Sequence, residues 1–180
     1  MKQIEVITGC MFAGKTTELI NRLRSIKQKY LLVKPLIDKR EEGDKVSTHS
    51  GIVEKAIRVN HLSDIFDMLK DIKVVGVDEA QFFKKSIVKD LKYLKSKDIR
   101  IILAGLDRDY LNKPFGSMSD ILSISDTVTV LKARCNNCQA PASYSFRKNT
   151  SQENQLLIGN ENFYEALCEV CFNEKQIHGK

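Results

Sequence analysis

The sequence predicts an α/β fold: a mostly parallel sheet covered by helices on both faces, followed by a small C-terminal unit. Segments with strand character alternate with segments of helical periodicity between residues 4 and 131, as in a parallel sheet with crossover helices. Strand segments such as Val74–Val77 carry no polar side chain, which is typical of strands buried on both faces. After Leu131 the pattern becomes irregular, and four of the five cysteines fall between residues 135 and 171.

The first 51 residues read as strand, helix, strand and loop. Residues 4–8 are apolar apart from one acid and predict a strand that stops at Gly9. Residues 16–29 place apolar side chains at helical spacing and predict a helix. A short strand follows at 31–33 and is expected to stop at a proline, and the polar residues 38–51 predict a loop.

The next 80 residues repeat the alternation. Residues 62–69 carry apolar side chains at i, i+3, i+4 and i+7 and predict a helix. Residues 74–77 predict a buried strand, residues 87–94 a second amphipathic helix, and residues 99–106 a long apolar strand. The β-branched run at 127–131 predicts a last strand.

The composition is that of a globular chain of one domain with a small addition. The 180 residues are 42% apolar and 29% charged, enough for a core and a solvated surface. No apolar run approaches the roughly 18 residues of a membrane span. Glu5 interrupts the N-terminal apolar segment and no small-residue cleavage site follows, which argues against a secretory signal. We therefore expect a cytoplasmic protein with no membrane partner.

An eight-residue motif follows the first strand. Gly9-Cys-Met-Phe-Ala-Gly-Lys-Thr16 fits G-x-x-x-x-G-K-S/T, the phosphate-binding loop. Its glycines let main-chain N–H groups point at phosphate oxygens, and the helix that follows presents its positive end to the same anion. Lys15 would reach the β- and γ-phosphates, and the Thr16 hydroxyl would bind Mg²⁺. An ordinary glycine turn is the alternative, which the position between a strand and a helix disfavours.

The net charge of +6 raises the question of a nucleic-acid partner. Residues 1–58 hold five of the six excess positive charges, and no run of five or more basic residues occurs. A modest excess beside a phosphate-binding loop suits a polyphosphate ligand as well as it suits DNA. The charge alone does not require a nucleic-acid partner, and we expect a nucleotide ligand and no nucleic acid.

The strand at 74–77 ends in an acid pair, Asp78-Glu79. In phosphate-loop proteins an acid at the end of a second strand holds the Mg²⁺ ion, the role expected here of Asp78. Glu79 is placed to accept a proton from an attacking nucleophile. The motif leaves open whether that nucleophile is water, as in an ATPase, or a substrate hydroxyl, as in a kinase. A surface acid pair after a buried strand is the alternative.

Two Cys-x-x-Cys pairs lie in the C-terminal unit: Cys135, Cys138, Cys168 and Cys171. Four thiolates are the ligand set of a tetrahedral structural zinc ion. The 29 residues between the pairs exceed the roughly 15–20 of a compact zinc ribbon, so a sizeable loop should project between them. Two disulfides are the alternative, disfavoured in a chain that reads as intracellular. A boundary near residue 132 would separate an ATP-binding domain, 1–132, from a zinc domain, 133–180.

Other residues are weaker candidates. Arg40 lies in the polar loop after a strand and could stabilise charge on a transferring phosphoryl group, although most loop arginines are merely solvated. Tyr110 and Phe115 lie beyond a strand end, where aromatic rings either stack on a base or pack in the core. Cys10, inside the phosphate-binding loop, reads as a small filler residue in preference to a redox group.

Together these features resemble the thymidine kinase family of the zinc-containing, phosphate-loop type, over essentially the whole chain. The resemblance rests on these motifs in this order: Gly9–Thr17 with Glu18-Leu19, Asp78-Glu-Ala-Gln-Phe-Phe83, Gly105-Leu-Asp107, Lys113-Pro-Phe-Gly116, and the two Cys pairs flanking Tyr144-Ser145 and Ile158-Gly159…Tyr164. It implies a RecA-like P-loop NTPase fold with a small zinc domain that carries a lasso-like substrate lid. It also implies transfer of the γ-phosphate of ATP to the 5′-hydroxyl of thymidine, giving dTMP and ADP.

The resemblance implies residue roles as well. Glu79 would be the general base for the 5′-hydroxyl, with Lys15 and Arg40 acting on the transferred phosphate. ATP and Mg²⁺ would contact Gly9, Cys10, Met11, Phe12, Ala13, Gly14, Lys15, Thr16, Thr17, Asp78 and Gln81. Thymidine would contact Met11, Phe82, Leu106, Tyr110, Phe115, Ser145, Leu157, Ile158, Gly159 and Tyr164. Zinc would anchor both ends of the lid, and the family suggests inhibition by dTTP and a homotetramer.

The sequence departs from the family pattern at three positions. Cys10 and Ala13 stand where Pro and Ser are common in this phosphate-binding loop, which could alter redox sensitivity. Tyr110 stands where Phe is common, so a phenol hydroxyl must be accommodated near the base. No departure removes a catalytic group.

Four alternatives share part of the pattern. A nucleic-acid-dependent ATPase would share Asp78–Gln81 and the basic excess, but such motors use two domains of this kind. A nucleoside monophosphate kinase with a zinc-bound lid would carry that lid in mid-chain. A zinc-ribbon binding module with a defunct ATP site is disfavoured because Lys15, Thr16, Asp78 and Glu79 are all present. A GTPase lacks support because no Asn-Lys-x-Asp motif occurs.

Overall fold

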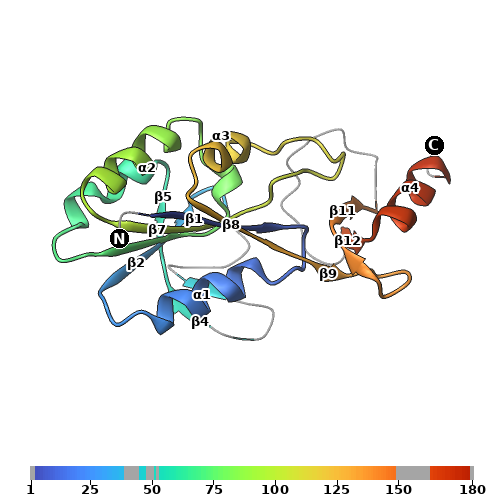
Figure 1. Ribbon diagram of the computed structural model, residues 1–180, viewed down its shortest axis with the longest axis horizontal. Helices are drawn as coiled ribbons and strands as arrows, with labels where there is room; N and C mark the ends of the chain where they lie inside the picture. Colours follow the sequence, from blue (N-terminus) through green and yellow to red (C-terminus); the bar gives the residue numbers. More distant parts are fainter. Residues whose placement is uncertain (1–2, 39–44, 48–50, 52, 149–162, 179–180) are drawn as a thin grey trace.

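A computed structural model describes residues 3–38, 45–47, 51, 53–148 and 163–178. Its centre is a six-stranded sheet made of β1 (Ile4–Gly9), β2 (Tyr30–Pro35), β5 (Ile57–Val59), β6 (Val74–Val77), β7 (Arg100–Ala104) and β8 (Thr127–Leu131). The order is β5-β2-β6-β7-β1-β8, and every neighbouring pair is parallel (Figure 1). The predicted α/β class is confirmed.

Helices cover both faces of this sheet (Figure 1). They are α1 (Lys15–Ser25), α2 (Ile87–Ser96), α3 (Met118–Ser123) and the 3₁₀ helix η1 (Leu62–Met68). Neighbouring residues of β1 serve opposite faces, since Ile7 packs with α1 and Val6 with η1, α2 and α3. Both clusters consist of buried apolar side chains, which explains why the central strands read as continuous apolar runs.

The first helix ends earlier than its periodicity predicts, at Ser25 and not at Lys29. Ile26 is extended, with φ −86° and ψ 129°, although its side chain still packs beside α1. The Ser25 hydroxyl donates to the Arg22 carbonyl at 2.7 Å, which satisfies an acceptor that another turn would have used. Residues 27–29 are exposed, so extending the helix would bury nothing.

The helix predicted at 62–69 is a 3₁₀ helix, not an α-helix. Leu62 and Ile65 are buried at i and i+3, a spacing that serves a helix of three residues per turn as well as one of 3.6. The Asp64 carboxylate accepts the main-chain N–H groups of Asn60 and His61 and caps this short segment.

The sequence patterns did not predict the short strands. Part of the predicted loop is strand, because β3 (Lys45–Ser47) pairs antiparallel with β4 (Val53–Lys55). The edge strand β5 and the helix α3 were also not predicted, and β7 is shorter than expected. Pro35 ends β2 without stopping the pairing, because the next residue, Leu36, donates its N–H to Val59 at 2.8 Å. Segments this short carry too few residues to show a period.

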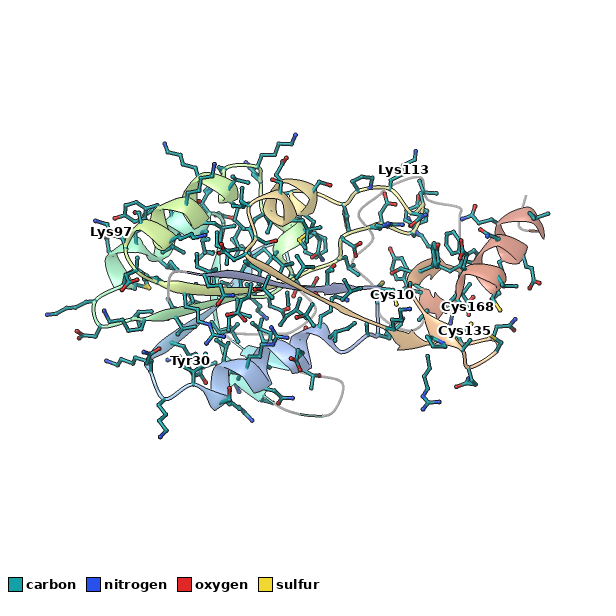
Figure 2. All side chains as sticks on the ribbon, viewed as in Figure 1. Cys10, Tyr30, Lys97, Lys113, Cys135 and Cys168 are labelled. Carbon is teal, nitrogen blue, oxygen red and sulfur yellow. The ribbon has the colours of Figure 1, made fainter. Side chains whose placement is uncertain are left out.

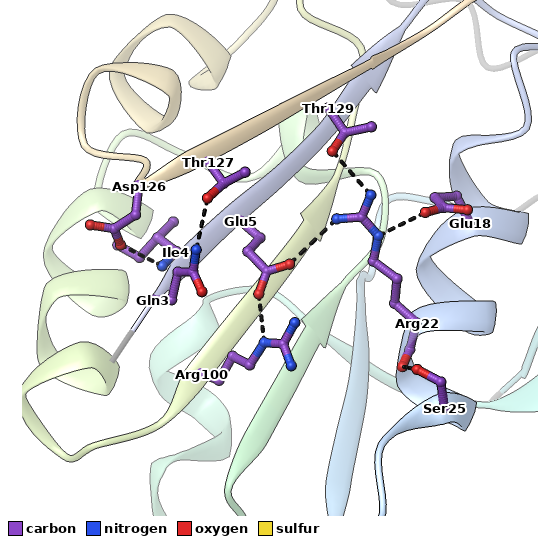
Figure 3. A network of polar contacts seen from close by, with 10 residues as sticks. All are labelled: Gln3, Ile4, Glu5, Glu18, Arg22, Ser25, Arg100, Asp126, Thr127 and Thr129. Carbon is purple, nitrogen blue, oxygen red and sulfur yellow. Dashed lines mark hydrogen bonds and ion pairs between the residues drawn. The ribbon is translucent and has the colours of Figure 1, made fainter. Parts of the chain in front are cut away.

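Glu5 is a charged residue buried in the sheet, and two arginines balance its charge (Figure 3). Glu5 of β1 has a side chain only 8% exposed. Its carboxylate meets Arg100 of β7 at 2.5 Å and Arg22 of α1 at 3.4 Å. Arg22 also donates to Thr129 of β8 at 3.0 Å and bonds Glu18 within its own helix at 2.8 Å. The network ties α1 to three strands.

We expect Glu5→Ala to destabilise the fold by about 2 kcal/mol, because it leaves two partly buried guanidinium groups without their shared carboxylate. The measurement is the free energy of unfolding from urea denaturation. The matched control is Glu18→Ala, which removes the more exposed partner of Arg22 and should change stability by less than about 0.5 kcal/mol. Equal effects of the two substitutions would contradict a special role for Glu5.

The chain ends in a small unit beyond the sheet, at the side where the carboxyl ends of the strands lie (Figure 1). It contains β9 (Ala133–Arg134), β10 (Pro141–Ala142), β11 (Tyr144–Arg147), β12 (Tyr164–Leu167) and α4 (Glu169–His178). β9 pairs with β10 and β11 with β12, both antiparallel. Within the described residues, no helix has the length and apolar character to cross a membrane.

Candidate active site

The phosphate-binding loop lies between β1 and α1, at the carboxyl edge of the sheet where ligands of open α/β folds bind. β7 separates β1 from β6, so the loop and the end of β6 lie two strands apart. Gly14 precedes α1 with φ 81°, a left-handed conformation that a glycine adopts without strain. The free N–H groups of the first turn of α1 therefore open onto the loop.

Lys15 folds back over this loop. Its ammonium donates to the Cys10 carbonyl at 2.6 Å. Burial lowers the pKa of Lys15, and the negative charges of Glu79, Asp78 and Asp107 oppose that shift. Three carboxylates therefore act electrostatically on this ammonium.

Thr16 of the phosphate-binding loop contacts Asp78, the acid that follows β6. The Thr16 hydroxyl lies 3.2 and 3.1 Å from the two carboxylate oxygens of Asp78. The Asp78 main chain is held in turn, because its N–H donates to Val33 of β2 at 2.9 Å. A hydroxyl and a carboxylate so close together are the oxygen ligands that Mg²⁺ prefers.

Glu79 follows with a strained backbone. Its φ of 51° and ψ of 45° are left-handed, a conformation that costs a non-glycine residue about 1–2 kcal/mol. Such outliers persist where the surroundings enforce them, commonly at functional sites. The Glu79 carboxylate accepts a hydrogen bond from Gln81, in the short 3₁₀ helix η2 (Ala80–Phe82).

The aromatic residues expected near a base pack against one another. Phe82 and Phe115 meet edge to face, with ring centroids 5.7 Å apart and an interplanar angle of 88°. Phe115 is 8% exposed, so core packing accounts for most of its surface. Leu106 donates its main-chain N–H to Gln81 at 3.0 Å and lies at the start of the same loop.

Two hydrogen bonds tie the phosphate-binding loop to the C-terminal unit. Ser145 Oγ of β11 accepts the Met11 N–H at 3.0 Å, and the Cys10 thiol donates to the Ala142 carbonyl at 3.4 Å. Cys10 and Phe12 pack in one apolar cluster with Leu167. Figure 2 shows Cys10 on the same side of the molecule as Cys135 and Cys168.

Cys10 behaves as the filler residue that the sequence suggested. Its side chain is 4% exposed, and burial raises the pKa of its thiol. A buried thiol with a raised pKa has little thiolate and little reactivity. Phe12 beside it has φ 65°, a strained conformation held by the same cluster.

The structure adds residues that the sequence did not single out. Arg147 is 2% exposed, and its guanidinium lies 5.0 Å from the ring centre of Tyr110, within cation–π range. Tyr164 is its neighbour across the β11–β12 pair, and burial raises the pKa of that phenol. Buried Asp109 accepts two main-chain N–H groups of the Tyr110 loop. In the sequence, the only signal for the Tyr110 loop was its position after the end of a predicted strand. No neighbouring motif indicated a role for Arg147.

The four cysteines form the expected cluster. The Sγ atoms of Cys135, Cys138, Cys168 and Cys171 all lie within 4.8 Å of one another. A tetrahedral zinc ion with Zn–S bonds of about 2.3 Å requires sulfur atoms roughly 3.8 Å apart, and the Cys138–Cys168 separation is 3.5 Å. Burial raises the pKa of Cys135, but main-chain N–H donors, led by that of Cys168, outweigh it and lower the pKa to about 6. This ligand set fits a structural zinc ion.

Some predicted site residues lie outside the described part of the chain: Arg40, Leu157, Ile158 and Gly159. Of the others, Thr16 meets Asp78, Met11 meets Ser145, and Lys15 lies within electrostatic reach of Glu79. Their roles toward ligands remain predictions.

Comparison with known proteins agrees with this arrangement. The thymidine kinase family profile matches residues 2–172. Thymidine kinase of Metamycoplasma arthritidis is 40% identical over 178 residues, covering 96% of this chain and 91% of its own. Thymidine kinase of Porphyromonas gingivalis is 38% identical over 174 residues, covering 95% and 85%. Thymidine kinase of Coprothermobacter proteolyticus is 40% identical over 175 residues, covering 93% and 88%.

A match of this extent spans both the parallel sheet and the four-cysteine unit. It includes the phosphate-binding loop, the acid pair after β6 and all four cysteines. The chain therefore belongs to the thymidine kinase family and is an ATP-dependent kinase.

Proposed function

We propose that the chain transfers the γ-phosphoryl group of ATP to the 5′-hydroxyl of thymidine, giving dTMP and ADP. The observation that carries the proposal is the convergence of Lys15, the Thr16–Asp78 pair and Glu79 at one edge of the sheet. This set can bind a polyphosphate and hold a proton acceptor beside it. Phosphoryl transfer needs positioning and charge neutralisation more than covalent chemistry.

Each residue has one task in this reaction. Main-chain N–H groups of Gly9–Thr17 and the Lys15 ammonium bind the β- and γ-phosphates. Thr16 and Asp78 would hold a magnesium ion, which neutralises phosphate charge when it is bound with ATP. Glu79 takes the proton from the 5′-hydroxyl of thymidine. The hydroxyl oxygen bonds to the γ-phosphorus as the bond between that phosphorus and the β-phosphate oxygen of ADP breaks.

Thymidine would bind between the Tyr110 loop and the C-terminal unit. Its expected contacts are Met11, Phe82, Leu106, Tyr110, Phe115, Ser145, Leu157, Ile158, Gly159 and Tyr164, with Arg40 at the transferred phosphate. The two-domain division at residue 132 belongs to the same proposal, with zinc anchoring both ends of a lid that keeps water from ATP. We also propose that dTTP inhibits the enzyme and that the chain forms a homotetramer in the cytoplasm. No nucleic-acid or membrane partner is part of the proposal.

The test is ADP release from Mg-ATP, with and without thymidine, compared with thymidylate, deoxycytidine and single-stranded DNA. Stimulation by thymidine alone, with dTMP formed, is expected. Stimulation by DNA, or hydrolysis indifferent to nucleosides, would mean that Glu79 activates water and would overturn the proposed reaction.

The Met11–Ser145 bond makes a further prediction, on nucleotide binding. We expect Ser145→Ala to weaken binding of an ATP analogue roughly fivefold, since one hydrogen bond contributes about 1 kcal/mol and this one shapes the phosphate-binding loop. Equilibrium binding without thymidine measures the effect apart from any thymidine contact.

Ser145→Thr, which keeps the hydroxyl, should restore most of the affinity. Ser143→Ala is the matched control, because Ser143 is an exposed neighbour on the same unit. Unchanged affinity in Ser145→Ala would show that the loop keeps its shape without this bond.

A further inference from the structure

Gln81 lies buried between the proposed base and the end of β7. The residue is only 2% exposed. Nε2 donates to the Glu79 carboxylate at 2.5 Å, and Oε1 accepts the Leu106 N–H at 3.0 Å. A main-chain N–H can only donate and an ionised carboxylate can only accept. One orientation of the carboxamide therefore satisfies both neighbours, with its N–H on Glu79.

The packing around Gln81 keeps the carboxamide in this place. A Cβ on Gly105 would lie 2.9 Å from Gln81 Oε1, and a Cβ on Gly116 would lie 1.9 Å from the Gln81 carbonyl oxygen. Both glycines therefore allow a close approach that a larger residue would block. The Phe82 N–H, donating to the Glu79 carbonyl at 3.1 Å, holds the turn between base and amide.

Glu79 needs such support because its own backbone is strained. The residue before it is fixed by the bond from Asp78 to β2, and its left-handed φ of 51° then directs the side chain. A flexible glutamate side chain has several rotamers, and holding one of them loses conformational entropy. A fixed donor removes that loss before the substrate arrives, which is how supporting residues increase rates.

We propose that Gln81 is a positioning residue for Glu79, holding the carboxylate in the rotamer in which it takes the proton from the acceptor hydroxyl. The contact of Gln81 with ATP or Mg²⁺ that the family resemblance implies stays a separate prediction. The inference rests on the proposed role of Glu79 as the base. It adds Gln81 as the residue that links Glu79 to Leu106, in the loop after β7.

The experiment is a double-mutant cycle on single-turnover phosphoryl transfer, with Gln81→Met and Glu79→Gln alone and combined. Gln81→Met should slow transfer roughly 10- to 100-fold, the size of a lost hydrogen bond to a charged group. Dissociation constants for ATP and thymidine should stay within about twofold. In the Glu79→Gln background the same substitution should have no further effect on the rate, because residues that act as a unit are non-additive.

Two more variants keep the result interpretable. Gln81→Glu preserves size and the bond from Leu106 but removes the donor to Glu79, so it should also slow transfer, even if Gln81→Met does not fold. Gln3→Met is the matched control, because Gln3 donates a side-chain bond to Thr127 at 2.7 Å at the opposite end of β1. It should leave the rate unchanged.

The outcomes separate the inference from the proposed reaction. An equal loss of rate from Gln81→Met in both Glu79 backgrounds, or weaker ATP binding with an unchanged rate, would overturn the positioning role alone. A wild-type rate in Glu79→Gln would overturn both the proposed base and the role of Gln81.

Discussion

Glu79→Gln should lower the rate of phosphoryl transfer by about 10²- to 10⁴-fold, the usual contribution of a positioned general base. The amide has nearly the same size as the carboxylate but cannot take a proton. Affinity for ATP should change little, because Lys15, Thr16 and the loop main chain bind the phosphates in the proposed site. Single-turnover formation of dTMP measures the rate, and equilibrium binding of an ATP analogue measures the affinity.

Glu79→Gln also alters the contact with Gln81, because one amide then faces another. A flip of the new side chain can present its oxygen to the Gln81 N–H, so the fold should be retained and thermal unfolding should stay close to wild type. Asp78→Asn is the informative comparison, since Asp78 is expected to act through the magnesium ion and its loss should weaken binding of Mg-ATP as well. Unchanged turnover in Glu79→Gln would remove Glu79 from the role of base.

The phosphate side of the site could be predicted because its geometry is local. A glycine-rich loop between a strand and a helix has few conformations, and parallel strands bring their carboxyl ends to one edge. With the expectation that Thr16 and Asp78 share a magnesium ion, these facts predict that the two side chains lie close together, as they do. The four cysteines are equally readable, because their spacing encodes a ligand set.

The contacts between the two parts of the chain could not be predicted, because they depend on how separate units dock. Nothing in the sequence near Ser145 indicates that its hydroxyl bonds the Met11 N–H. Arg147 looks like any strand arginine until the fold places it against Tyr110. The two bonds of Gln81 are a third case, since only the folded chain places its carboxamide between Glu79 and Leu106.

Cys138→Ser should remove most of the zinc from the protein. Structural zinc sites contribute about 10–16 kcal/mol in total, so the loss of one of four thiolates should weaken binding by more than about 100-fold. The apolar cluster of the C-terminal unit is small, with Ala142, Ala166, Leu167 and Phe172 as its buried non-cysteine members, and a core of this size depends on a metal for stability. Metal content per chain and thermal unfolding are the measurements.

Cys10→Ser is the matched control, because it makes the same substitution in the one cysteine outside the cluster and should leave the metal content unchanged. Full metal content with normal unfolding in Cys138→Ser would exclude the four-cysteine site. The phosphate-binding loop adds a second readout. Since Cys10 and Phe12 pack in the core of the zinc unit and Met11 bonds Ser145, loss of zinc should weaken ATP binding at least as much as Ser145→Ala does. An unchanged ATP affinity in the zinc-depleted protein would mean that the loop holds its conformation from the sheet side alone.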